Sequence, residues 1–136
     1  MDDYILDTNH LSPVITPRHP LRIQILQQIR RGDRFAVGAP ILTEFLYGIQ
    51  TARRSRQNMT EWNQLRHSFA FYRVDEPEEE YAARLQVILK RQGVQLKTVD
   101  ALIAAIALHH DLILLTTDKD FRKVPDLRQE SWLTSL

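Results

Sequence analysis

Short aliphatic segments alternate along this chain with segments of helical periodicity, and no other feature constrains the fold as strongly. The predicted strands are residues 4–6, 34–38, 71–74, 112–115 and 129–133. Residues 112–115 are purely aliphatic, a pattern typical of a strand buried on both faces of a parallel sheet. Strands that alternate with helices predict an α/β fold with a mainly parallel central sheet and helices on both faces, in three layers.

The segments between these strands carry apolar residues at intervals of three and four, which indicates helices. We expect helices over residues 21–31 and 59–69, helices that begin near Pro40 and Pro77, and a helix over residues 98–110 with Thr98 as its N-cap. Gly32 and Gly93 are expected to end the helices that precede them. The last helix is apolar nearly all round and should be deeply buried. Prolines at positions 13, 17 and 20 predict an irregular loop.

The length of 136 residues fits one domain, predicted over residues 1–136. The absence of cysteine favours a reducing cytoplasm, and the acidic N-terminus is unlike a signal peptide. The longest strongly apolar run, residues 101–108, is far shorter than the ~20 residues that span a bilayer. We therefore expect a cytoplasmic protein with no membrane partner.

Four acidic residues lie at the ends of predicted elements, and they are Asp7, Glu44, Asp100 and Asp118. Asp7 and Asp118 closely follow aliphatic strands, so both should emerge at the carboxyl edge of the sheet, where ligands bind in such folds. Asp100 begins the buried helix, where a carboxylate needs a partner or a metal ion. Gathered carboxylates repel one another unless a cation neutralises them, and Mg²⁺ prefers oxygen ligands. The four together predict a metal site.

Each acid also has a purely structural interpretation. Asp7 can cap a helix, Asp118 can belong to a solvated turn, and Asp100 can stabilise a helix dipole. Glu44 lies off the apolar stripe of its helix, so periodicity alone predicts an exposed side chain. The net charge of +1 comes from 18 basic and 17 acidic residues. Setting the four acids aside leaves 17 − 4 = 13 acidic residues and a balance of +5, which suits a polyanion.

Four motifs in a fixed order carry a family resemblance. ILDTN, PILTEFLYG, DALIAAIAL and LLTTDKDFRKVPDL resemble PIN domains, and more narrowly the VapC-type toxins of prokaryotic toxin–antitoxin pairs, over residues 4–127. The resemblance implies that Asp7, Glu44, Asp100 and Asp118 bind Mg²⁺, or Mn²⁺ in its place, for RNA hydrolysis by metal-activated water. It places Asp120 at the margin of this site. The polar positions that it places near the metal are Thr8, Asn9 and Thr116.

The resemblance implies a Mg²⁺-dependent endoribonuclease with an RNA substrate such as tRNA, a small cognate antitoxin and a homodimer. One alternative is a catalytically inactive PIN-like module that binds RNA or a protein. A second is a phosphatase with an aspartyl nucleophile. Such phosphatases commonly carry another Asp two positions on, where this chain has Asn9. Several arginines could contact RNA phosphates or form an ordinary solvated surface, and they are Arg30, Arg31, Arg34, Arg53, Arg54 and Arg56.

Overall fold

Five parallel strands form one sheet, in the order β3-β2-β1-β4-β5, in the computed structural model, which describes residues 1–133. The strands are β1 (Asp3–Leu6), β2 (Arg34–Gly38), β3 (Ala70–Tyr72), β4 (Ile113–Leu115) and β5 (Gln129–Glu130). This architecture confirms the α/β fold and the parallel sheet predicted from the alternating pattern. The two edge strands, β3 and β5, are shorter than predicted.

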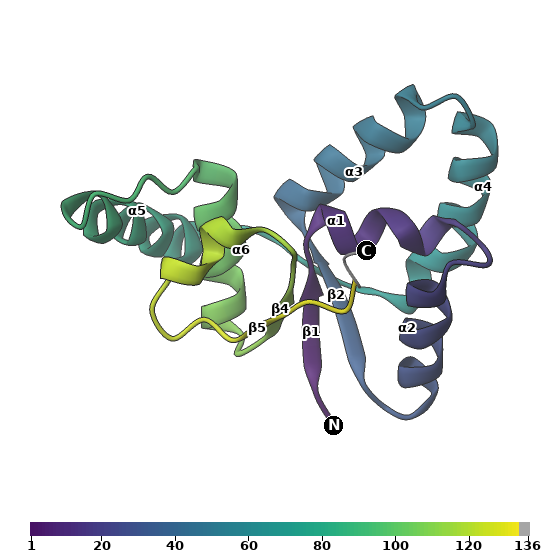
Figure 1. Ribbon diagram of the computed structural model, residues 1–136, viewed down its shortest axis with the longest axis horizontal. Helices are drawn as coiled ribbons and strands as arrows, with labels where there is room; N and C mark the ends of the chain where they lie inside the picture. The colour runs from purple at the N-terminus through teal and green to yellow at the C-terminus, as the bar shows by residue number, and fades with distance from the viewer. Residues whose placement is uncertain (134–136) are drawn as a thin grey trace.

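Helices cover both faces of the sheet (Figure 1). They are α1 (Thr8–Leu11), α2 (Pro20–Arg30), α3 (Ala39–Thr51), α4 (Ser55–Leu65), α5 (Glu76–Arg91) and α6 (Thr98–His109). Helices α1 to α4 lie on one side, and α5 and α6 lie on the other (Figure 1). Right-handed crossovers explain this, since the chain steps from β1 to β2 and β3 and then returns across β1 to β4. The sheet order therefore reverses between β1 and β4, which is where ligands bind in open α/β sheets.

The core confirms the expected burial of the helix before β4. In α6 the buried residues are Ala101, Ile103, Ala104, Ala105, Ile106 and Ala107. Gly32 and Gly93 follow α2 and α5 with φ angles of 103° and 78°, a conformation that favours glycine, and they end these helices as predicted. The two tryptophans pack in or against the core. Trp62 contacts Phe45, and Trp132 contacts Tyr4, each with ring centroids 4.9 Å apart.

Three local predictions were wrong. The proline-rich segment is only partly an irregular loop, because α1 is followed by a 3₁₀ helix over Ser12–Ile15 that has proline in its first turn and buries two aliphatic side chains, while residues 16–19 lack regular structure. Helix α4 begins at Ser55 rather than residue 59 and ends at Leu65, where a 3₁₀ turn over Arg66–Ser68 follows. Thr98 is the first residue of α6 and not its N-cap, because the extended residue before it is Lys97.

Within residues 1–133, no helix has both the length and the apolar character needed to cross a bilayer.

Candidate metal centre

The site begins where β1 and β4 end side by side. Leu6 and Leu115 are partners in the parallel register, and the next residue, Asp7, donates its backbone N–H to the Leu115 carbonyl at 3.0 Å. Asp7 and Thr116, which follow the two strands, therefore lie side by side at the carboxyl edge of the sheet. This is the edge at which the aliphatic pattern predicted Asp7 and Asp118 to emerge.

Three donors inside the protein hold the carboxylate of Asp7. Its Oδ1 accepts the backbone N–H of Thr8 at 2.8 Å. Its Oδ2 accepts the hydroxyl of Thr116 at 2.7 Å and the side-chain amide of Asn9 at 3.2 Å. Asp7 is 8% exposed and also caps α1. The same side chain therefore caps a helix and forms part of the site. A carboxylate has about four lone-pair positions, so one remains to accept a further partner.

A second group of carboxylates lies beside Asp7. One oxygen from each of Asp100, Asp118 and Asp120 lies within 4.8 Å of the others. Asp100 comes from the first turn of α6, and the other two come from the loop and 3₁₀ turn after β4. The Thr116 hydroxyl connects the two groups, because it donates to Asp7 and accepts the backbone N–H of Asp118 at 2.9 Å. Asp118 in turn accepts the backbone N–H of Asp120 at 2.9 Å.

Glu44 completes the arrangement from α3. It is exposed, as its helical periodicity predicted, and its Oε1 lies 3.5 Å from the hydroxyl of Thr8. Asp7, Glu44, Asp100 and Asp118 all line one open pocket of about 610 Å³. The other lining residues are Thr8, Asn9, Ser12, Lys97, Thr98 and Val99. The four acids that the sequence singled out therefore share one pocket although they come from four separate segments.

The electrostatics of Asp100 show that its charge is disfavoured by burial and by like charge. Burial, together with the negative charges of Asp118, Asp7 and Asp120, raises its pKa from 3.8 to about 6. The positive charge of Lys97 lowers it. Half-buried carboxylates that face one another are stabilised by a cation. The ligand atoms are all oxygens, so the donor set fits a hard divalent ion such as Mg²⁺ or Mn²⁺.

The structure changes the weight of some residues. Asp120, expected at the margin, has a carboxylate oxygen within 4.8 Å of carboxylate oxygens of both Asp100 and Asp118. Lys97 was not singled out from the sequence, although a basic residue three positions before Asp100 could have signalled it. His10 was also missed, because nothing in its position indicated that its side chain is completely buried.

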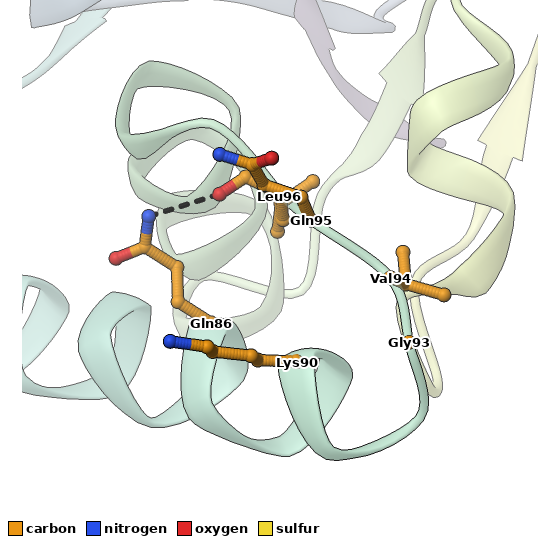
Figure 2. Close-up of a pocket in the computed structure, with 6 residues that line it drawn as sticks. All are labelled: Gln86, Lys90, Gly93, Val94, Gln95 and Leu96. Atoms are coloured by element: carbon orange, nitrogen blue, oxygen red, sulfur yellow. Dashed lines mark hydrogen bonds between the residues drawn. The ribbon is translucent and has the colours of Figure 1, made fainter.

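A second pocket, of about 620 Å³, lies where α5 ends and the chain turns towards α6 (Figure 2). Its lining residues are Gln86, Lys90, Gly93, Val94, Gln95 and Leu96, and none of them is acidic. Gln86 donates its side-chain amide to the Leu96 carbonyl at 2.9 Å (Figure 2) and to the Thr98 hydroxyl at 3.2 Å. These hydrogen bonds fix the start of α6, and with it the positions of Lys97 and Asp100.

The fold and the gathered acids define the class of protein. Residues 4–127 match the PIN domain family, and the chain belongs to this family. It is 24% identical over 130 residues to a protein named Ribonuclease VapC2 from Rickettsia felis, a match that covers 95% of this chain and 97% of that protein. The resemblance to VapC-type proteins that the motifs indicated is thus confirmed.

Solved structures extend this likeness to the whole fold. A chain of VapBC2 from Rickettsia felis, solved with a DNA fragment from the VapBC2 promoter, matches with a TM-score of 0.84 at 23% identity over 96% of this chain and 98% of that chain. DNA-bound VapBC from Salmonella typhimurium matches with a TM-score of 0.83 at 21% identity, over 98% and 100% of the two chains. VapBC-1 from nontypeable Haemophilus influenzae matches with a TM-score of 0.78 at 23% identity, over 96% of this chain and 98% of that chain.

Proposed function

We propose that this protein is a divalent-metal-dependent endoribonuclease and the toxin of a toxin–antitoxin pair. The observation that carries the proposal is the convergence of four acids from separate segments on one pocket, with the pKa of Asp100 raised to about 6. A binding module has no need of such a costly cluster. A relative named as a ribonuclease and the solved VapBC structures support the same activity and an antitoxin partner. The proposal includes a homodimer, an RNA target such as tRNA, and a cytoplasmic location.

The roles of the residues follow from their contacts. Asp7, Asp100, Asp118 and Glu44 would hold Mg²⁺, with Mn²⁺ as a substitute, and Asp120 lies close enough to support them. A bound ion would supply positive charge for the phosphate oxygens and lower the pKa of an attacking water. Thr8, Asn9 and Thr116 orient the carboxylate of Asp7 by hydrogen bonds. Lys97 lies in the same pocket and can bind a phosphate of the substrate.

The test of this function is an assay on total RNA with the purified chain, free of antitoxin. We expect cleavage in Mg²⁺ or Mn²⁺, loss of cleavage when EDTA removes the ion, and recovery when Mg²⁺ is added in excess. End labelling should find 3′-hydroxyl and 5′-phosphate products. Cleavage that persists unchanged in EDTA would contradict the metal site. RNA binding without any cleavage, and without a metal site in a titration, would favour the inactive PIN-like module instead.

A second prediction concerns Lys97. Replacing it with alanine should weaken RNA binding about fivefold. It should also lower the slope of log affinity against log salt concentration by about one, the change expected when one phosphate contact is lost. The matched control is Lys90→Ala, which removes another exposed positive charge beside the other pocket. Filter binding across a range of salt concentrations measures both quantities. Equal slopes and equal affinities in the two variants would show that Lys97 does not contact the substrate.

A further inference from the structure

His10 is a buried side chain whose protonation is fixed by its neighbours. It is 0% exposed, and its Nε2 lies 3.0 Å from the backbone N–H of Trp132. Because a backbone N–H can only donate, Nε2 must be the unprotonated nitrogen, and the proton of the neutral ring lies on Nδ1. Burial also lowers the pKa of His10 to about 4, so the ring is neutral at physiological pH. Nδ1–H therefore donates to Asn9 Oδ1, at 2.6 Å.

This hydrogen bond determines which side of the Asn9 amide faces Asp7. Asn9 Oδ1 accepts from His10 Nδ1–H and, at 3.2 Å, from the backbone N–H of Thr117. The Asn9 NH₂ group consequently faces the carboxylate of Asp7, where it donates to Oδ2 at 3.2 Å. A flipped amide would set its NH₂ group against two N–H donors and its oxygen against a carboxylate. Of the two donors that prevent the flip, His10 lies nearer.

The segment after β5 holds the Trp132 N–H, the donor to His10, in place. The indole of Trp132 packs edge-on against Tyr4 and Phe35, with ring centroids 4.9 and 5.7 Å apart. This packing holds the Trp132 backbone N–H in place, although Trp132 lies 122 residues from His10 in the sequence. A continuous chain of hydrogen bonds thus leads from the end of the sheet to the carboxylate of Asp7.

We propose that His10 is a positioning residue of the metal site, which orients Asn9 against Asp7 in the tautomer that the Trp132 N–H selects. The inference rests on the proposed function, because it takes Asp7 as a metal ligand. Hydrogen-bond partners of metal ligands typically change metal affinity 10- to 100-fold when they are removed. His10 acts through Asn9, one bond further away, so we expect an effect at the lower end, about tenfold.

Two isosteric substitutions separate the two hydrogen bonds of His10. In His10→Asn the side-chain N–H lies near the position of Nδ1 and can still donate to Asn9, but the Trp132 N–H loses its acceptor. In His10→Gln the side-chain carbonyl lies near the position of Nε2 and can still accept from Trp132, but the donor to Asn9 is lost. His10→Asn leaves the Trp132 N–H without its acceptor, and His10→Gln removes one of the two hydrogen bonds that Asn9 Oδ1 accepts, so both should lose stability. Only His10→Gln should bind Mn²⁺ about tenfold more weakly, while His10→Asn stays within about threefold of the wild type.

Calorimetric titration of the full chain with Mn²⁺ measures these affinities, and urea unfolding in EDTA measures the stabilities. Leu89→Ala is the control for stability alone, since it opens a cavity in α5 at a fully buried position outside the acidic pocket. It should lose stability and keep the affinity of the wild type. Imidazole ¹⁵N spectra of the metal-free wild type provide a third measurement and should show His10 as the neutral Nδ1–H tautomer.

The outcomes are distinct. A His10 ring in the Nε2–H tautomer would overturn the inference, even if neither variant folds. Equal Mn²⁺ affinity in His10→Gln and the wild type would overturn it as well, and so would a loss in Leu89→Ala as large as that in His10→Gln. If the wild type itself bound no Mn²⁺, the proposed function would fail together with the inference.

Discussion

Replacing Asp100 with asparagine should reduce metal-dependent RNA cleavage roughly a thousandfold and at the same time make the metal-free protein more stable. Cleavage falls because the pocket loses a negative ligand for the ion. Stability rises because burial removes solvent from the charged carboxylate of Asp100, which also faces Asp118, Asp7 and Asp120, while only Lys97 offsets their charge. Asparagine keeps the size of the side chain and removes its charge. The gain at pH 7 should be on the order of 1 kcal/mol, with allowance for solvent around a half-buried group.

The gain should depend on pH in one direction. Asp100 has a pKa of about 6 in the folded protein and an ordinary value of 3.8, so between these values the folded chain keeps a proton that the unfolded chain loses. The contribution of Asp100 to stability is therefore complete below about pH 4 and is lost as the pH rises through 6. The difference between Asp100→Asn and the wild type should grow from pH 4 to pH 6 and then level off.

Urea unfolding in EDTA at several pH values measures this difference, and the assay on total RNA measures cleavage. Asp126→Asn is a suitable control, because it removes an exposed carboxylate at a positive φ angle that asparagine also tolerates. It should change neither quantity. Wild-type cleavage by Asp100→Asn would remove this residue from the proposed site. A variant less stable than the wild type in EDTA would show that the neighbouring carboxylates do not repel Asp100.

Most of the fold could be predicted because each central element carries its own periodic signal. The aliphatic run before Thr116 is buried throughout and the apolar helix after Asp100 is mostly buried, and such burial leaves a continuous apolar pattern in the sequence. The segment after Leu11 could not be predicted, because prolines there suggested a loop. Whether proline interrupts a helix or occupies its first turn depends on the helix start, and the start here is set by Asp7 and by packing against β1.

The residues of the candidate site also differ in how far the sequence could predict them. Asp7 and Asp118 were predictable because they follow strands, and strand order in a parallel sheet places them at one edge. Glu44 could only be suggested by the family resemblance, since its periodicity indicates no more than an exposed side chain. The link through His10 could not be predicted at all. It joins residues 122 positions apart, and their contact exists only once the segment after β5 has packed on the sheet.

Replacing Asp7 with asparagine should reduce cleavage as strongly as Asp100→Asn but should destabilise the metal-free protein. The sequence alone predicts that cleavage falls because a metal ligand is lost, and the structure shows why the folded state should also lose stability. The carboxylate of Asp7 accepts the Thr8 N–H on one oxygen and the Asn9 amide and Thr116 hydroxyl on the other. An asparagine side chain has one oxygen, so in either orientation its NH₂ group meets an N–H donor. Such a mismatch at a buried site costs about 1–3 kcal/mol.

The two substitutions therefore make the same chemical change at two proposed ligands with opposite effects on stability. Urea unfolding of both variants in EDTA at pH 7.5 gives the sign for each, and excess Mn²⁺ should stabilise the wild type more than either variant. The reason is that hydrogen bonds within the protein stabilise the carboxylate of Asp7, whereas burial and the repulsion of neighbouring carboxylates destabilise that of Asp100. A stability change of the same sign in both variants would contradict this distinction. Equal stabilisation of the wild type and the variants by Mn²⁺ would contradict the metal site itself.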